Sequence, residues 1–332
     1  TMAASSKGAV LGAVIGNAAL TAIKTVAFLV SGSGAMLSEA VHSFADTANQ
    51  ALLFIGIRRS ERPADERYPY GYGGERYFFA LLSAAGIFFL GCGVSVYHGI
   101  RALIHPHHLD LQPLVFIVLG ISLLVEGFIF VIALKSVWAQ KKGMPLLEYV
   151  QKATDPTGIA VLLEDFVACL GVLIAAAGIL LSYYTHSPTW DAIASIVIGL
   201  MLGGVALWLG WSNRRLILGP AVPEELTDQI LEYLRAQPSI RRVERYRTRI
   251  LGAHAFRLST DVEFDPAWLG REEAELARTT NPGQDADAEA WTNYTSRLAD
   301  GMLERIAGEI DRIERELITR HPDLVAVDLE TD

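Results

Sequence analysis

Six long apolar stretches fill residues 8–212 and restrict what this chain can fold into. They cover about residues 9–31, 34–57, 77–100, 112–137, 157–183 and 189–211. Each is close to the ~20 residues that an α-helix needs to cross the hydrocarbon core of a bilayer. The pattern therefore predicts an integral membrane protein whose first domain is an all-α bundle of six transmembrane helices.

Composition separates this membrane domain from the rest of the chain. Hydrophobic residues make up 51% of the sequence. The mean hydropathy of +0.30 is too high for an ordinary soluble protein of this length. The apolar residues crowd into residues 1–212, whereas residues 213–332 are rich in charge. We therefore expect a six-helix transmembrane domain over 1–212 and a second, cytoplasmic domain over 213–332.

The second domain carries most of the net charge of −9. Acidic residues outnumber basic ones there, which argues against a nucleic-acid partner. Its pattern predicts helices at 224–236 and 291–320 and strands at 243–251, 255–264 and 325–329. The order αββαβ predicts a ferredoxin-like α+β domain. The acidic, turn-rich residues 266–290 predict a mobile insertion in it.

The distribution of basic residues predicts the orientation in the membrane. They gather in the segments after the second, fourth and sixth stretches, namely Arg58, Arg59, Arg62, Arg67, Arg76, Lys141, Lys142, Lys152, Arg214 and Arg215. The opposite segments hold only Arg101. Because positive charge favours the cytoplasmic side, we expect both termini in the cytoplasm. The membrane that we expect is the cell (inner) membrane.

Two polar side chains inside the second apolar stretch form the strongest functional signal. His42 and Asp46 are four residues apart, so a helix places both on one face. A charged side chain at the bilayer centre costs about 3 kcal/mol, which favours a role in pairing or function. One imidazole nitrogen and one carboxylate make half of a tetrahedral divalent-metal site. The alternative is a His–carboxylate pair that only stabilises helix packing.

The fifth stretch carries the adjacent acids Glu164 and Asp165. Adjacent residues point about 100° apart on a helix, so the two cannot face one point equally well. Asp165 is the better candidate ligand. Glu164 either reaches the same cavity or lies at a helix interface.

Further polar residues interrupt the apolar stretches. Glu39, one turn before His42, is either an accessory carboxylate of the site or a residue at the membrane edge. Asn49, in the same stretch, is a candidate hydrogen-bond partner for the site or for a neighbouring helix. Glu126, in the fourth stretch, either joins a proton path or pairs with Lys24 or another base.

Taken together, these features resemble the cation diffusion facilitator family. The resemblance rests on six spans, His-xxx-Asp in the second span, an acidic pair in the fifth, and an αββαβ tail. Residues 42–50, 68–71, 97–99, 155–157 and 161–165 are more narrowly similar to the branch that contains zinc transporter nine. The similarity covers nearly the whole chain.

The resemblance implies a secondary transporter that works as a homodimer and is not an enzyme. Such a transporter exchanges a cytoplasmic divalent ion, usually Zn²⁺, for protons. Zn²⁺ is then a transported substrate rather than a resident cofactor. We expect the exchange to proceed by alternating access.

By the same resemblance, His42, Asp46 and Asp165 match three of the family's four metal ligands. Val161 stands where a fifth-span His is usual, which leaves Glu164 or water as the fourth ligand. One His with mostly carboxylates makes a harder site, so a Mn²⁺ or Fe²⁺ exporter is an alternative. A passive metal channel without proton coupling is a second alternative.

Overall fold

The computed structural model describes residues 2–106, 113–140, 145 and 157–331. The chain forms two compact units. We call the first the helical unit (Thr1–Arg62 and Gly74–Ile217) and the second the sheet unit (Pro63–Gly73 and Leu218–Asp332). The basic residues Lys141, Lys142 and Lys152, and residues 155–156, lie outside the described residues.

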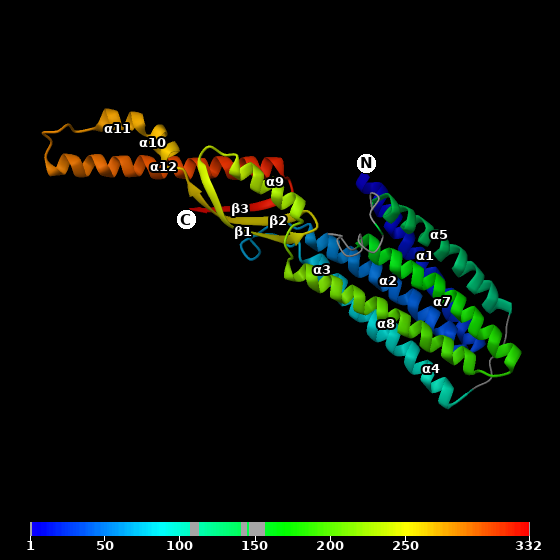
Figure 1. The fold of residues 1–332 in the computed structure, drawn as a ribbon. Coiled ribbons are helices and arrows are strands. Elements are labelled where there is room, and N and C mark those ends of the chain that lie inside the picture. Colours follow the sequence, from blue (N-terminus) through cyan, green and yellow to red (C-terminus); the bar gives the residue numbers. More distant parts are fainter. Residues whose placement is uncertain (1, 107–112, 141–144, 146–156, 332) are drawn as a thin grey trace. The chain divides into compact units, whose positions relative to one another are not determined.

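The helical unit is built from long helices (Figure 1). Their bounds are α1 (Met2–Ser31), α2 (Gly34–Ser60), α3 (Glu75–Gly86), η1 (Ile87–Gly93), α4 (Val94–Ile104), α5 (Pro113–Gln140), α7 (Thr157–Thr185) and α8 (Thr189–Leu218). The π-helical segment η1 joins α3 and α4 into one continuous rod. The expected boundary between the domains, at residue 212, falls inside α8.

Four of the described helices are long and apolar enough to cross a membrane. They are Glu75–Ile104, Pro113–Ala139, Val161–Thr185 and Thr189–Leu218, and Gly16–Ser31 of α1 forms a shorter apolar helix. The 27 residues of α2 are less apolar because they include the acidic and basic side chains considered below. The expectation of a helical membrane domain is confirmed, and the number of six spans stays a prediction.

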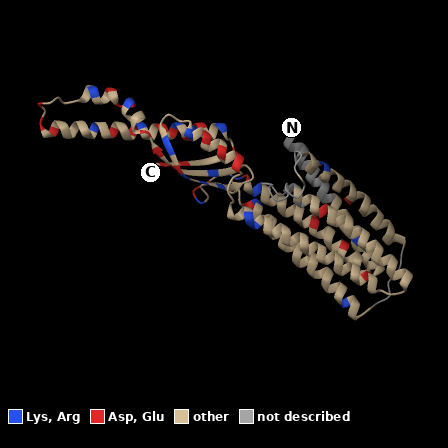
Figure 2. Ribbon diagram, viewed as in Figure 1, with Lys and Arg blue, Asp and Glu red and all other residues tan. Residues whose placement is uncertain are grey.

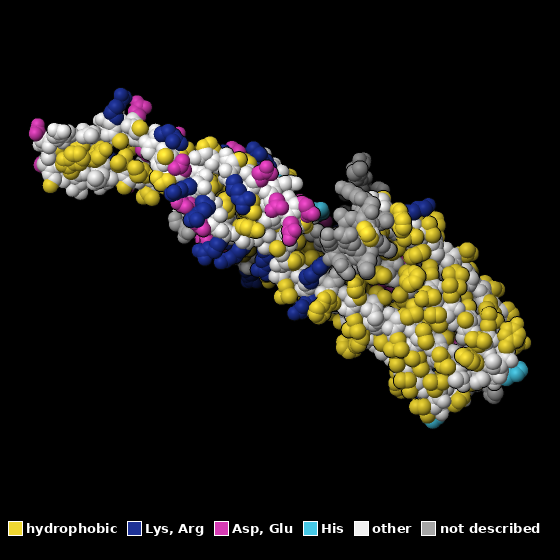
Figure 3. Space-filling view, viewed as in Figure 1, with side chains coloured by type: hydrophobic (Ala, Val, Ile, Leu, Met, Phe, Trp, Pro, Cys, Tyr) yellow, Lys and Arg dark blue, Asp and Glu magenta, His cyan; other side chains and the backbone are white. Residues whose placement is uncertain are grey.

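The outer surface of the helical unit is apolar. Leu29, Phe89, Leu124 and Phe128 are each more than two thirds exposed, and hydrophobic side chains cover the face seen in Figure 3. Charged residues are scarce along the helices and dense in the sheet unit (Figure 2). Because a soluble protein does not expose so continuous an apolar surface, the helical unit is an integral membrane domain.

Small residues let the rod of α3, η1 and α4 pack closely against α8. A Cβ added at Gly99 would lie 2.5 Å from Cγ1 of Ile196, and one added at Gly199 would lie 2.9 Å from Cβ of Ser95. The Ser195 hydroxyl donates to the carbonyl of Ser95 at 2.9 Å. Small residues and hydroxyls at the contact are typical of helix pairs in membranes, where burial of apolar surface does not drive association.

The sheet unit contains α9 (Glu224–Arg235), β1 (Ile240–Gly252), β2 (Ala255–Phe264), α10 (Pro266–Glu272), α11 (Ala274–Thr280), α12 (Ala288–Arg320) and β3 (Leu324–Thr331). The strand order is β1-β2-β3, with β1 antiparallel and β3 parallel to β2. Side chains of the two main helices, such as Leu234 and Ile313, share one core with Leu258 of the sheet. A small C-terminal sheet is thus confirmed, and the ferredoxin-like arrangement stays a prediction.

Most of the segment 266–290, where the composition predicts a turn-rich, mobile insertion, forms the helices α10 and α11, and its mobility stays a prediction. Asp265 caps α10 by accepting a hydrogen bond from the amide of Ala267 at 2.9 Å. Arg305 of α12 donates to the buried carboxylate of Glu273 at 3.2 Å. A cap and an ion pair across the sequence therefore order a segment whose composition alone predicts irregular structure.

The segment Pro63–Gly73, which links α2 to α3, is part of the sheet unit and packs on its strands. The Arg257 guanidinium lies over the ring of Tyr70 at 4.9 Å, and it also donates to Asp328 of β3 at 2.6 Å. Gly73 lies so close to the carbonyl of Leu251 that a Cβ would come within 2.6 Å of that oxygen. A cation–π contact and a close backbone approach thus attach the α2–α3 connection to the sheet.

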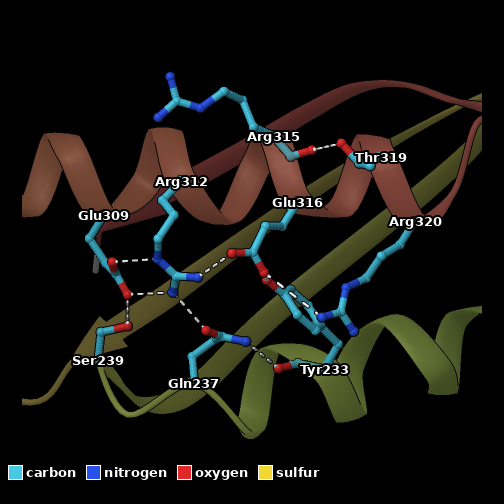
Figure 4. A network of polar contacts seen from close by, with 9 residues as sticks. All are labelled: Tyr233, Gln237, Ser239, Glu309, Arg312, Arg315, Glu316, Thr319 and Arg320. Atoms are coloured by element: carbon cyan, nitrogen blue, oxygen red, sulfur yellow. Dashed lines mark hydrogen bonds and ion pairs between the residues drawn. The ribbon is translucent and has the colours of Figure 1, made fainter.

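A polar network centred on Arg312 joins α12 to α9 and to the segment between α9 and β1 (Figure 4). The guanidinium donates to both carboxylate oxygens of Glu309 at 2.8 Å, to Glu316 at 2.7 Å and to the amide oxygen of Gln237 at 2.7 Å. Ser239 donates to Glu309 at 2.6 Å. The hydrogen bonds from Arg312 hold the pKa of Glu309 below its usual range.

We predict that Arg312→Met weakens the packing of α9 on α12. In the wild type, the ion pair of Arg312 with Glu309 contributes fully to stability above the unfolded pKa of Glu309, about 4.3. This contribution is lost as pH falls through the lower folded pKa. The free energy of opening of α9 and α12 should differ between variant and wild type by about 1 kcal/mol near neutral pH, since solvent screens the half-exposed guanidinium. This difference should shrink toward pH ~3. Amide hydrogen exchange of α9 and α12 measures it.

The matched control is Arg315→Met, because that exposed side chain on the same helix makes no ion pair among the described residues. An equal loss of protection in both variants, at every pH, would contradict this role of the network.

Candidate metal site

Helix α2 carries the first candidate ligands, and its start is fixed to α8. Ser33 caps α2 by accepting a hydrogen bond from the amide of Met36 at 3.1 Å. The carboxylate of Asp191, at the start of α8, accepts from the amide of Gly34 at 2.6 Å and from the Ser33 hydroxyl. Asp191 carries no sequence signal that indicates this role. These bonds hold the first turn of α2 against the start of α8 and so fix the position of the helix that carries His42 and Asp46.

His42 and Asp46 lie on the same face of α2, as the spacing predicts. The Nε2 atom of His42 is 3.5 Å from an Asp46 oxygen, which is longer than a normal hydrogen bond. The imidazole is 3% exposed, and neither of its nitrogens has a hydrogen-bond partner. A pair that only stabilised packing would leave fewer buried polar atoms unsatisfied, so the geometry favours a ligand role.

Asp165 lies on α7, which packs against α2. One of its carboxylate oxygens is buried without a hydrogen-bond partner. Asp165 and Asp46 lie close enough for their charges to repel each other. Val161, one turn earlier on α7, is 37% exposed. The structure therefore brings Asp165 toward the polar face of α2, and the side chain of Val161 offers no ligand atom.

The three candidate ligands are neighbours rather than a closed coordination shell. Within the described ranges, no group of three His, Cys, Asp or Glu side chains is arranged to hold an ion as it stands. Ion binding would need the side chains of α2 and α7 to move closer together. The unsatisfied atoms of His42 and Asp165 are the groups that such a movement would satisfy.

Glu164 and Asn49 meet at a helix interface. The amide of Asn49 donates to both oxygens of Glu164, at 3.0 and 2.9 Å. Its carbonyl oxygen accepts from the hydroxyl of Ser83 on α3 at 2.6 Å. The chain Ser83–Asn49–Glu164 thus connects α3, α2 and α7. Of the two alternatives for Glu164, the structure favours the interface, although Asp46 and Asp165 are within electrostatic range.

Glu39 and Glu126 share one buried partner, Lys24 of α1. The ammonium donates to Glu39 at 2.8 Å and to Glu126 at 2.7 Å. Lys24 and Glu39 are fully buried, and Glu126 is nearly so. Glu126 therefore pairs with Lys24, one of the partners that the sequence left open. Glu39 makes an ion pair inside the bundle rather than facing solvent.

Sequence comparisons identify the family. Residues 10–218 match the cation efflux transmembrane domain. The chain is 34% identical over 313 residues to the human and mouse proteins named proton-coupled zinc antiporter SLC30A9, mitochondrial, which covers 92% of this chain and 55% of theirs. It is 33% identical over 336 residues to metal tolerance protein C4 of Arabidopsis thaliana, covering 98% and 73%.

A bacterial relative extends the comparison. The cation-efflux pump FieF of Shewanella oneidensis is 28% identical over 241 residues, covering 71% of this chain and 75% of that protein. The chain spans about half the length of the SLC30A9 proteins. The names of these relatives refer to zinc antiport, metal tolerance and cation efflux. The chain belongs to the cation diffusion facilitator (cation efflux) family, as the motifs predicted, and members of this family are secondary transporters rather than enzymes.

We predict that Asn49→Ala destabilises the metal-free protein by about 1–3 kcal/mol, because it removes two hydrogen bonds to a carboxylate and leaves Ser83 without its acceptor. Chemical unfolding of the purified protein in detergent measures the effect. Thr47→Ala is the control, because its hydroxyl donates only to the carbonyl of Ser43 in the same helix. A loss that appears only with metal present would instead make Asn49 a ligand.

Proposed function

We propose that this protein exports a divalent metal ion, above all Zn²⁺, from the cytoplasm in exchange for protons. The observation that carries the proposal is the buried His42, whose two nitrogens are unsatisfied beside Asp46 and near Asp165. The match to the cation efflux domain covers all three residues. The names of the human and mouse relatives, proton-coupled zinc antiporters, support the choice of ion.

The ligand set suits a divalent ion of intermediate hardness. Zn²⁺ accepts His nitrogen and carboxylate oxygen in a tetrahedral shell, and a transport site can keep water as one ligand. Because Val161 cannot bind metal, the fourth ligand is water or Glu164. A site with one nitrogen and several oxygens also suits Mn²⁺ or Fe²⁺, so an exporter of one of these ions is the alternative.

Protons and metal compete for the same atoms. Metal binds when the imidazole is neutral and the carboxylates are ionised, so binding releases protons and proton arrival releases the ion. An unperturbed His titrates near pH ~6.5, which allows this exchange close to neutrality. Alternating exposure of the site to the two sides of the membrane completes the cycle, and each ligand shifts the population of the two states.

The proposal includes six spans, with α1 and α2 as the two beyond the four strongly apolar helices. The 27 residues of α2 are about 40 Å long at ~1.5 Å per residue, enough to cross a bilayer. The buried ion pair of Lys24 with Glu39 removes two charges from the lipid-facing surface. We further propose both termini in the cytoplasm, a ferredoxin-like sheet unit and a homodimer.

The membrane itself is part of the proposal. The expected location is a cell (inner) membrane, whereas the human and mouse relatives are named mitochondrial. Both kinds of membrane carry a proton gradient, so the proposed exchange works in either one.

We predict that Asp46→Asn and Asp165→Asn each reduce Zn²⁺ uptake into proteoliposomes at least ~10-fold, because each removes a charged ligand. The wild-type protein should respond to an imposed pH gradient. Asp311→Asn, an exposed change on α12, serves as the control and should leave uptake unchanged. Flux that ignores the gradient would favour a passive channel, and normal uptake by both ligand variants would reject the proposed site.

A further inference from the structure

The most unusual group in the helical unit is the fully buried Lys24. Lysine is almost never fully buried unless it is paired. Here the ammonium connects three helices, because it donates from α1 to Glu39 of α2 at 2.8 Å and to Glu126 of α5 at 2.7 Å. Two carboxylates and one ammonium leave one net negative charge. None of these three side chains is among the matched ligands His42, Asp46 and Asp165, and Glu39, the accessory candidate, is paired with Lys24.

The other oxygen of each carboxylate is also buried, and neither has a hydrogen-bond partner. These atoms are Oε1 of Glu39 and Oε2 of Glu126. Oε1 of Glu39 faces Gly171 of α7 so closely that a Cβ there would lie 2.5 Å away. Buried carboxylate oxygens are normally satisfied by donors or cations. The cluster therefore offers more acceptor atoms than the single ammonium uses.

The Nζ atom of Lys24 lies between two carboxylates, at a point where a free cation could bind. Its two carboxylate partners come from different helices and converge on one point at 2.7–2.8 Å. Carboxylate oxygens bind Zn²⁺ at about 2.0–2.2 Å, so shifts of less than about 1 Å would convert the same oxygens into metal ligands. His42 is one turn from Glu39 on α2 and lies within the field of all three charges.

We propose that Lys24 is a tethered cation that occupies a second carboxylate site, formed by Glu39 and Glu126. By filling this site permanently, the ammonium keeps a divalent ion from being held there. It thereby confines the transported ion to His42, Asp46 and Asp165. Lys24 is therefore a specificity-determining residue. This inference rests on the proposed function only in taking Zn²⁺ as the ion.

Loss of Lys24 has a different effect if the residue only stabilises packing than if it occupies a cation site. If Lys24 only stabilises packing, its loss weakens the protein whether or not metal is present. If it holds the place of an ion, its loss opens a site with two carboxylates, and a divalent ion replaces it. The number of ions bound per chain separates the two roles.

The test compares Lys24→Met and Lys24→Gln with the wild type. Bound Zn²⁺, and Cd²⁺ as a second probe, is counted per chain by equilibrium dialysis of the full-length protein in detergent. We expect each variant to bind one ion per chain more than the wild type. Adding Glu126→Gln to Lys24→Gln should return the count to the wild-type number. Lys135→Met, which removes an exposed charge from α5, should leave the count unchanged.

A folded Lys24 variant with the wild-type count would overturn the proposal. If both variants are too unstable to purify without metal, excess Zn²⁺ should raise their unfolding midpoint more than that of the wild type, because an ion that binds only the folded state stabilises it. Absence of that extra shift would also overturn it. The count does not depend on transport, so failure of this inference would leave the Asp46→Asn and Asp165→Asn results intact.

Discussion

The high free-energy cost of exposing charge to lipid decides how the helical unit is arranged. Lys24 and the acids Glu39, Glu126 and Asp191 are buried within the helical unit, where they meet other polar groups. Lys24 compensates Glu39 and Glu126. Asp191 receives the backbone and side-chain donors at the start of α2. In the proposed function, the atoms of His42 and Asp165 that lack a hydrogen-bond partner are the groups that bind the ion or a proton.

Helix α2 is where these interactions meet. Its first turn is bonded to α8, its middle is paired with α1 through Glu39, and Asn49 connects it to α3 and α7. The segment that follows α2 is attached to the sheet unit by Tyr70 and Arg257. The helix that carries two of the three candidate ligands therefore has polar connections to α1, α3, α7 and α8, so a change in its position affects several helices at once.

Sequence patterns predicted the features that depend on local periodicity. The spacing of His42 and Asp46 placed them on one face of a helix, and the αββαβ order followed from alternating and amphipathic segments. Contacts between distant residues could not be derived in this way. The sequence left Glu126 with several possible partners, and only the three-dimensional packing joins residues 24, 39 and 126. The acidic composition of 266–290 also hid the Asp265 cap and the Glu273–Arg305 pair that accompany its two short helices.

The central claim is that one imidazole and several carboxylates hold the transported ion. X-ray absorption at the zinc edge, on the full-length protein loaded with one equivalent of Zn²⁺, tests this claim most directly. The chain has two free cysteines, Cys92 and Cys169. The account predicts a single imidazole among oxygen ligands, no sulfur from either cysteine, and loss of the imidazole signal in His42→Ala. Two or more imidazoles, a sulfur ligand, or an unchanged spectrum in that variant would place the ion elsewhere in the chain.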